Sequence, residues 1–300
     1  MKLKKIIIKK VLKFRNNLAD EIAYKINRIN LIQYLNQRNF DSYDKIIDET
    51  NHGLTVSLTT FGTRINETYL AIESIGLQTL KPGRIVLWLT EGEYNHLPST
   101  LKKLQKRGLT INYYKDIKAY KKLIPSIRKY PNDIIITIDD DIIYGRELVE
   151  NLYMKHKEYN NTVCCGDAKL ITTLDKKLTP YNTWHSNTNE TYHPNAKTFP
   201  IGFAGTLYFP GCFHTDILNE EKFMKLCPYN DDIWFKSMCL LNNTLSMNIN
   251  NTFSSVNTNI PIQKAQKDSL SMINVVKNEN DNQLQNLLKE YPELIRKISN

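Results

Sequence analysis

Short apolar runs alternate with helical patterns along the chain from residue 54 onward. Runs rich in β-branched residues predict strands at 54–58, 84–89, 109–114, 134–138 and 162–166. Patterns with a period near 3.6 predict helices at 68–77, 98–106, 119–129 (interrupted near Pro125), 145–159, 215–226 and 231–241. This regular alternation is typical of an α/β protein with a parallel central sheet, whose ligands bind at the carboxyl ends of the strands.

The first thirty residues carry a different pattern. Apolar side chains recur every three or four positions, at Ile7, Val11, Phe14, Leu18, Ile22 and Ile26. Nine basic residues accompany two acidic ones, an excess of seven positive charges. We expect an amphipathic helix on an anionic membrane surface, where each nearby Lys or Arg contributes about 1 kcal/mol. The alternative is a helix packed on its own domain. A secretory signal is disfavoured, because lysines interrupt the short apolar run and no small-residue cleavage site follows it.

The remaining 270 residues are close to neutral, with 31 basic and 29 acidic side chains. The formal charge of +9 therefore belongs to the N-terminal segment, and a nucleic-acid partner is not expected. No apolar run reaches the roughly 18–20 residues of a membrane-spanning helix. Five cysteines without C-x-x-C spacing favour a reducing compartment. We expect a cytoplasmic protein, peripheral on the inner face of the membrane, with a basic helical extension (1–50), a main domain (51–250) and a polar, helical C-terminal tail (251–300).

The sharpest chemical feature is the triplet Asp139, Asp140 and Asp141, directly after the apolar run 134–138. Adjacent carboxylates repel one another and are poorly suited to a packed core. At the carboxyl end of a buried strand they suit a hard divalent cation, Mn²⁺ or Mg²⁺, that holds a phosphate-bearing substrate. The alternative is a solvated acidic turn that caps the helix near Gly145.

A second acidic pair, Asp231 and Asp232, precedes an amphipathic run. Either carboxylate could cap the N-terminus of that helix. One carboxylate is enough for a cap, so the other is available as a general base. Between the two acidic clusters, Gly202 and Gly205 predict either close approach of the backbone to a ligand or a bulged strand.

These segments together resemble the nucleotide-sugar glycosyltransferases of the GT-A fold, in particular bacterial family-2-like enzymes of surface-polysaccharide assembly. The resemblance covers about residues 54–245. It rests on five ordered segments: VSLTTFGTRIN (56–66), AIESIGLQTLKPGRIVLWLTEGE (71–93), YKKLIPSIRKYPNDIIITIDDDIIYG (120–145), FAGTLYFPG (203–211) and PYNDDIWFKSM (228–238). The family implies a Rossmann-like, mostly parallel sheet flanked by helices.

The resemblance also implies a role for each matched position. A nucleotide-sugar donor, UDP-linked, would be bound by Thr59, Thr60, Arg64, Asp116, Lys122, Asp139 and Asp140. Lys121 competes with Lys122 for the diphosphate. The cation would be held by Asp139 and Asp141, with Asp140 able to replace either. The sugar and acceptor pocket would be shaped by Gly202, Ala204 and Gly205, on a strand at 202–205, and by Trp234.

The family chemistry implied is transfer of one sugar to a hydroxyl of a glycan or lipid-linked acceptor. Asp232 would be the base, with Asp231 beside it, and the configuration would be inverted. Many relatives have a late histidine that completes the metal shell, but the last histidine here is His214. Asp268, the diphosphate or water would have to replace it. The tryptophan motif of processive synthases is missing, which favours single transfer.

Two other functions remain open at the level of sequence. A HAD-type Mg²⁺-dependent phosphatase also places D-x-D after an apolar strand. However, here the triplet follows the fourth predicted strand, and the later acidic pair follows Pro-Tyr-Asn rather than a strand. A non-catalytic glycosyltransferase-like scaffold at the membrane is the other possibility, against which the intact acidic motifs argue.

Overall fold

The computed structural model describes residues 2–249, 259–262 and 279–299, with side chains from Glu21 to Ile298 within these ranges. The chain divides into two compact units, Met1–Ser42 and Tyr43–Asn300. The first unit consists of one long helix, α1 (Lys2–Asp41), as the N-terminal pattern predicts. No helix in the described part of the chain combines the length and apolarity that crossing a membrane requires.

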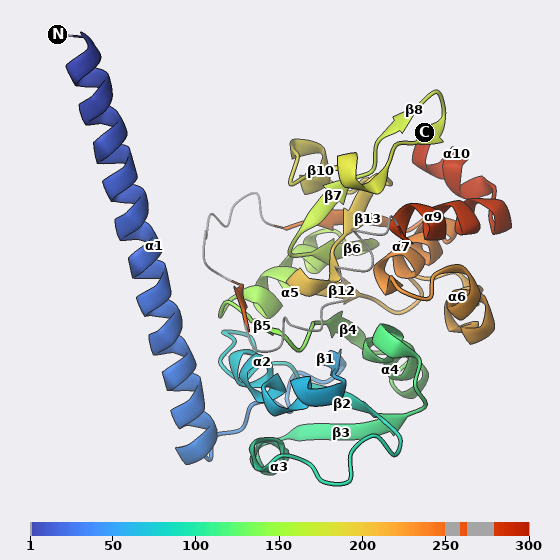
Figure 1. Cartoon of the computed structure of the whole chain (residues 1–300). Coiled ribbons are helices and arrows are strands. Elements are labelled where there is room, and N and C mark those ends of the chain that lie inside the picture. The colour runs from blue at the N-terminus through green and yellow to red at the C-terminus, as the bar shows by residue number, and fades with distance from the viewer. Residues whose placement is uncertain (1, 250–258, 263–278, 300) are drawn as a thin grey trace. The chain divides into compact units, whose positions relative to one another are not determined.

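A seven-stranded sheet forms the centre of the second unit, in the order β13-β6-β12-β4-β1-β2-β3 (Figure 1). Its strands are β1 (Leu54–Thr59), β2 (Arg84–Thr90), β3 (Leu109–Tyr114), β4 (Ile134–Thr137), β6 (Thr162–Cys165), β12 (Thr206–Tyr208) and β13 (Leu245–Asn248). All neighbours are parallel except β12, which is antiparallel to both β4 and β6. The order β3-β2-β1-β4 is of the Rossmann type. Its direction of winding changes between β1 and β4, where ligands of such sheets bind.

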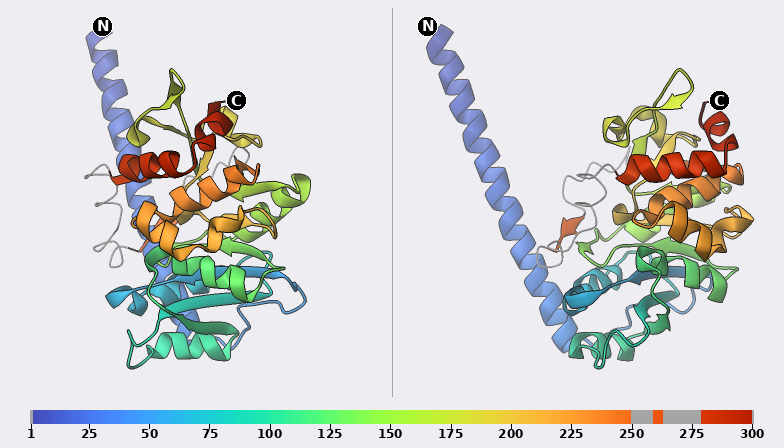
Figure 2. Two further views of the ribbon diagram at one scale, coloured as in Figure 1. Left: turned by 90° about the vertical axis from the view of Figure 1, so that its right-hand side faces the viewer. Right: turned by 45° about the vertical axis from the view of Figure 1, so that its right-hand side comes forward.

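Helices cover both faces of this sheet (Figure 2). One face packs on α2 (Thr68–Ile75), α3 (Ser99–Lys106) and α5 (Leu148–Glu158). The other packs on α4 (Ile124–Lys129), α6 (Glu220–Leu226), α7 (Asp231–Leu241), α9 (Glu279–Glu290) and α10 (Glu293–Ser299). Neighbouring residues of β4 separate between the faces, since Ile136 belongs to the first core and Ile135 to the second. The predicted α/β class, with a mostly parallel sheet flanked by helices, is confirmed.

Shorter strands lie outside the main sheet. A three-stranded sheet contains β7 (Ala168–Leu170), β10 (His185–Ser186) and β11 (Thr198–Pro200). Two pairs complete the set: β5 (Ile142–Ile143) with β14 (Ile260–Pro261), and β8 (Thr173–Leu174) with β9 (Lys177–Leu178). All five cysteines are buried and free, so no disulfide joins these elements.

Three predicted elements differ in the structure. The stretch 119–129 is a 3₁₀ turn (Lys118–Lys122) followed by α4, because Pro125 has no N–H to donate and fits only the first turn of a new helix. The predicted helix at 215–226 is likewise a 3₁₀ turn (Thr215–Leu218) followed by α6. The Asn219 side chain caps α6, because it accepts from the N–H of Lys222. The expected strand at 202–205 is wrong: Gly202–Ala204 is a 3₁₀ turn, and Gly205 has a φ of 87°.

Candidate active site

Asp139, Asp140 and Asp141 follow β4 at the carboxyl edge of the sheet, beside the end of β1. The N–H of Ile138 still donates to the carbonyl of Ser57 on β1 (3.1 Å), and the chain then leaves the sheet. Asp140 and Asp141 are buried, whereas the Asp139 side chain is 31% exposed. The triplet is therefore not a solvated acidic turn.

Arg64 neutralises part of the buried charge. It lies in the 3₁₀ turn Gly62–Asn66 after β1, and its Nη2 is 2.5 Å from Asp140 Oδ1 and 2.6 Å from Asp141 Oδ2. The hydroxyl of Thr60 donates to the other oxygen of Asp140 (2.5 Å). Both oxygens of Asp140 are thus engaged, which leaves Asp139 and Asp141 as the better candidates for an added ligand.

Burial dominates the ionisation of the two inner carboxyls. It raises the pKa of Asp140 to about 7, although Arg64 and Thr60 act in the opposite direction. Burial and the neighbouring Asp139 likewise raise the pKa of Asp141, again against the effect of Arg64. One guanidinium does not offset two buried carboxylates, so another cation close to them would be stabilising.

Lys122 joins the triplet to the second acidic pair. Its Nζ lies 3.0 Å from Asp139 Oδ1, 3.0 Å from Asp231 Oδ2 and 3.9 Å from Asp232 Oδ1. Burial alone would lower the pKa of Lys122, but the three carboxylates together raise it well above its ordinary value. Lys122 is therefore an ammonium ion on which both acidic clusters converge.

The N-terminus of α7 holds Asp231 and Asp232 in its first turn. The cap is Asn230, whose side chain accepts from the N–H of Ile233 (3.3 Å). Neither aspartate is therefore the cap, a role that the sequence left open for either, and both lie at the positive end of the helix dipole. This arrangement leaves both carboxylates available for the site.

Asp232 is held by the turn that precedes β12. The N–H of Gly202 donates to Asp232 Oδ2 (2.9 Å). A Cβ atom at this position would lie 2.5 Å from Asp232 Oδ1 and 2.9 Å from Lys122 Nζ, so only glycine permits the approach. Burial raises the pKa of Asp232 to about 7, against the lowering effect of Lys122. A carboxyl with this pKa is suited to general-base chemistry near neutral pH.

Tyr144 also belongs to this group, although the sequence interpretation did not single it out. Its buried hydroxyl accepts from the N–H of Asp139 (2.8 Å) and donates to the carbonyl of Phe203 (2.8 Å). It thus joins the acidic triplet to the glycine turn beside Asp232. In the sequence, its position three residues after the triplet is the one signal that could have indicated its role.

The remaining predicted site residues contact other parts of the fold. The Thr59 hydroxyl donates to the carbonyl of Trp88 (2.9 Å). Lys121 forms an ion pair with the largely exposed Asp116 (2.7 Å), whereas Lys122 pairs with Asp139 of the triplet, which favours Lys122 for the site. Asp268 lies outside the described residues.

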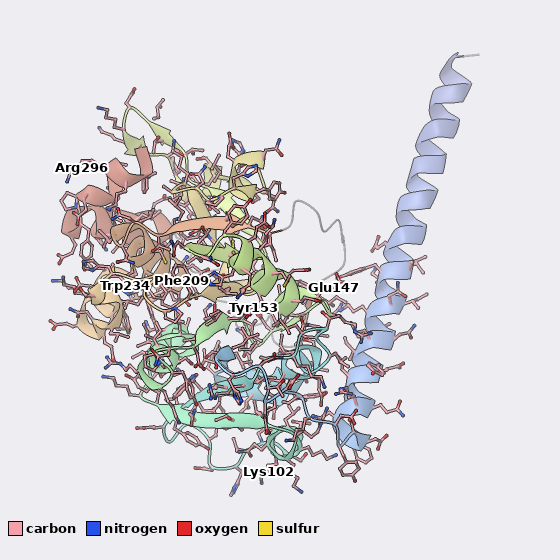
Figure 3. All side chains as sticks on the ribbon, turned by 180° about the vertical axis from the view of Figure 1, so that it is seen from behind. Lys102, Glu147, Tyr153, Phe209, Trp234 and Arg296 are labelled. Atoms are coloured by element: carbon pink, nitrogen blue, oxygen red, sulfur yellow. The ribbon has the colours of Figure 1, made fainter. Side chains whose placement is uncertain are left out.

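Of the residues predicted for the sugar and acceptor pocket, Gly202 contacts Asp232, and the others contact different parts of the fold. Ala204 ends the 3₁₀ turn and is buried against Gly166, the residue after β6, where a Cβ atom would lie 2.3 Å from the Ala204 carbonyl oxygen. Gly205 turns the chain into β12, against Leu148. Trp234, labelled in Figure 3, is fully buried in the core, and its indole N–H donates to the carbonyl of Ile217 (3.2 Å). The structure therefore contradicts a place for Trp234 in a sugar pocket.

The residues present fit a hard divalent cation. Five aspartates face two cationic side chains, which leaves an excess of negative charge when all are ionised. Mg²⁺ usually takes only one or two protein carboxylates, together with substrate phosphates and water. Among the residues that the structure describes, no three acidic, histidine or cysteine side chains form a ready-made metal site. Asp139 and Asp141 would thus hold a cation jointly with a phosphate-bearing substrate.

No protein-family model matches the chain, and no curated protein is similar to it in sequence. Among solved structures, it is similar to the mannosyltransferase PcManGT from Pyrobaculum calidifontis in complex with GDP-Man and Mn²⁺ (13% identity, TM-score 0.41, covering 76% of this chain and 64% of that one). It is also similar to S. aureus TarS (12%, 0.42, 65% and 35%). A third match is CMP:2-keto-3-deoxy-manno-octonic acid synthetase complexed with CTP (13%, 0.37, 65% and 88%).

The chain matches less than two thirds of the length of the first two of these proteins. Identities of 12–13% and TM-scores below 0.5 do not assign the chain to a family. Its function therefore has to follow from the site.

Proposed function

We propose that the protein is a metal-dependent glycosyltransferase of the GT-A type. It would move one sugar from a nucleoside-diphosphate sugar, UDP-linked, to a hydroxyl of a glycan or lipid-linked acceptor. One observation carries the proposal: Asp139, from the end of β4, and the pair Asp231 and Asp232, from the start of α7, converge on Lys122. Sugar transfer requires both a charge centre for the leaving diphosphate and a base for the acceptor, and these two clusters would supply them.

The position of the triplet supports a nucleotide donor. The triplet follows β4, and Thr60 and Arg64 follow β1, so they lie on either side of the point where the winding of the sheet changes. Nucleotides of Rossmann-type sheets bind at this point. Arg64 and Lys122 form ion pairs with the triplet and are proposed to bind the diphosphate. Thr59 and Asp116 are proposed to contact the nucleoside.

Asp139 and Asp141 are proposed to hold Mn²⁺ or Mg²⁺. When bound, the cation would stabilise the negative charge that develops on the leaving diphosphate. Lys122 would contribute positive charge to the same region, since it stays protonated among three carboxylates. Tyr144 would keep the backbone of Asp139 fixed relative to the turn at Phe203.

Asp232 is proposed as the general base. As the acceptor oxygen attacks the anomeric carbon, its proton would pass to the Asp232 carboxylate. The bond between that carbon and the diphosphate oxygen would break on the opposite side. The nucleoside diphosphate leaves with the bonding electron pair, and the configuration is inverted. Gly202 orients the base through its N–H.

The biological setting is proposed from the sequence segments that resemble enzymes of bacterial surface-polysaccharide assembly. The acceptor would be a growing glycan or glycolipid at the inner face of the cytoplasmic membrane. The basic segment 1–30, with its excess of seven positive charges, would bind that anionic surface.

A screen of nucleotide sugars tests the proposed function. We expect one donor to be hydrolysed slowly in the presence of Mn²⁺ and to raise the melting temperature, with both effects lost in D139N and retained in the distant variant D133N. Release of phosphate from a generic phosphomonoester with Mg²⁺ would instead indicate a phosphatase. Absence of UDP binding in calorimetry, with and without Mn²⁺, would indicate a scaffold.

A further inference from the structure

Arg64 contacts the acidic triplet in an unusual way. Arginine–carboxylate pairs are frequently bidentate, with two N–H groups on one carboxylate. Here one nitrogen, Nη2, lies between two carboxylates, 2.5 Å from Asp140 and 2.6 Å from Asp141. The residue is 8% exposed, and its buried Nε has no hydrogen-bond partner among the described residues. The guanidinium thus resembles a bound cation shared by two ligands.

This position overlaps with the one proposed for the metal. Asp141 is both a partner of Arg64 and a candidate ligand of the divalent cation. A metal ion binds carboxylate oxygens at about 2.0–2.6 Å, and it repels a guanidinium on the same oxygen. The divalent cation and the Arg64 guanidinium would therefore compete for the Asp141 carboxylate.

We propose that Arg64 is an internal counter-ion that a divalent cation displaces from Asp141, and that the released guanidinium then binds the donor diphosphate. The first half concerns only the protein and the metal, and the second half rests on the proposed function. A planar guanidinium with an unused Nε–H is suited to bidentate contact with phosphate oxygens. Metal and nucleoside diphosphate should therefore bind cooperatively, each favouring the state that the other requires.

The test measures Mn²⁺ binding to the full chain without nucleotide, from the electron paramagnetic resonance signal of free Mn²⁺. The measurement is made at about pH 8, above the usual pKa range of carboxyl groups. Because a competing charge is removed, R64M should bind Mn²⁺ at least about tenfold more tightly than the unmodified protein. The matched control is R84M, which breaks an ion pair with Asp133 (2.5 Å) at the opposite edge of the same sheet and should not change the affinity. Equal or weaker binding by R64M would overturn the competition.

A second arm adds saturating UDP. In the unmodified protein UDP should tighten Mn²⁺ binding about tenfold or more, and in R64M this gain should largely disappear. An equal gain in both proteins would overturn the release of Arg64. Failure of UDP to bind at all would count against the proposed function and its UDP donor, while the metal-only arm still decides the competition. If R64M does not fold, as judged by circular dichroism, R64Q replaces it with the same expected outcomes.

Discussion

Asp139 and Asp231 are far apart in the sequence, yet each carboxylate lies 3.0 Å from the same ammonium group, that of Lys122. Asp139 closely follows the buried strand β4, whereas Asp231 is the first residue of helix α7. Lys122 itself is buried, so the three charges form one electrostatic unit rather than separate surface pairs. A change on one side of this unit is therefore expected to alter the other.

The first prediction concerns the base. In D232N the amide oxygen can still accept from the N–H of Gly202, so the fold and donor binding should persist. Turnover should fall by about two orders of magnitude or more, the usual effect of losing a general base. Initial rates with saturating donor measure this. D231N is the matched control, because Asp231 contacts the same lysine, and it should keep turnover within about tenfold. The reverse pattern would reassign the base to Asp231.

The second prediction is the pH dependence of kcat/KM. A base acts only when it is ionised, and burial raises the pKa of Asp232 to about 7. Below this value kcat/KM should fall about tenfold per pH unit, and above it the profile should level. Lys122 lowers the pKa of Asp232, so K122M should move the midpoint to higher pH. A profile that is flat between about pH 5 and 8 would contradict the assignment of Asp232.

Much of the sheet was predictable because β-branched runs and punctuating glycines report local structure directly. Residues 134–138 are apolar without interruption, as a strand buried on both faces requires, and the strand and its acidic end were predicted correctly. The sequence interpretation failed where a turn replaced regular structure. At Gly202 the backbone is set by the approach of Asp232 from a distant helix, and no local pattern reports such an approach.

The pairing of charges was also hidden from the sequence. A solvated acidic turn remained the alternative to a cation site for the three aspartates, but Arg64 and Thr60 return from the end of β1 and make burial of Asp140 possible. The choice between Lys121 and Lys122 could not be made either, because it depends on which side of a short 3₁₀ turn faces the triplet. Both are tertiary facts rather than sequence motifs.

The third prediction tests the hydroxyl of Tyr144. Y144F removes the partner of the Asp139 N–H and of the Phe203 carbonyl, both at 2.8 Å. We expect the free energy of unfolding to fall by about 1–3 kcal/mol, and Mn²⁺ affinity to weaken because Asp139 is no longer fixed. Urea unfolding and Mn²⁺ titration measure the two effects. Y153F, on α5, removes a hydroxyl away from the triplet and should change neither quantity. Unchanged Mn²⁺ binding in Y144F would limit Tyr144 to a structural role.

The fourth prediction concerns residues 1–30. Their deletion should release the protein from vesicles that contain anionic lipid, while activity on a soluble acceptor persists. With about 1 kcal/mol for each basic residue near the surface, binding by the intact protein should weaken strongly as salt rises. Vesicle co-sedimentation over a salt series measures this. The anchor is refuted if the truncated protein sediments like the intact one.

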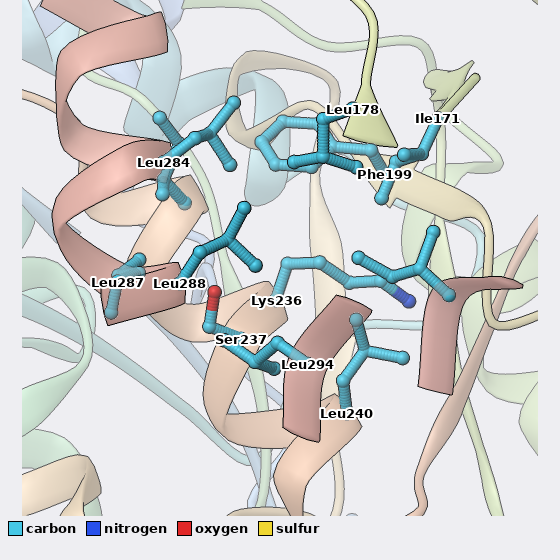
Figure 4. Close-up of a pocket in the computed structure, with 12 residues that line it drawn as sticks. Ile171, Leu178, Phe199, Lys236, Ser237, Leu240, Leu284, Leu287, Leu288 and Leu294 are labelled. Atoms are coloured by element: carbon cyan, nitrogen blue, oxygen red, sulfur yellow. The ribbon is translucent and has the colours of Figure 1, made fainter. Parts of the chain in front are cut away.

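The fifth prediction uses the buried lysine of α7. Lys236 lines a narrow cavity among leucine side chains of α7, α9 and α10 (Figure 4), and its Nζ donates to Ser246 Oγ (3.1 Å). Burial lowers the pKa of Lys236 to about 8, against smaller effects of Cys239 and Cys165. The folded state thus binds this proton less tightly than the unfolded state, whose lysine titrates near 10.4. Lys236 therefore destabilises the fold below pH 8, by about 3 kcal/mol, and this effect fades as the pH rises toward 10.4.

K236M should accordingly raise the free energy of unfolding at neutral pH. The gain should be about 2 kcal/mol, since loss of the bond to Ser246 offsets about 1 kcal/mol. The difference between variant and unmodified protein should shrink steadily between about pH 8 and 10. Urea unfolding at several pH values measures the difference, and a gain that does not depend on pH would show that packing, rather than the buried charge, causes it.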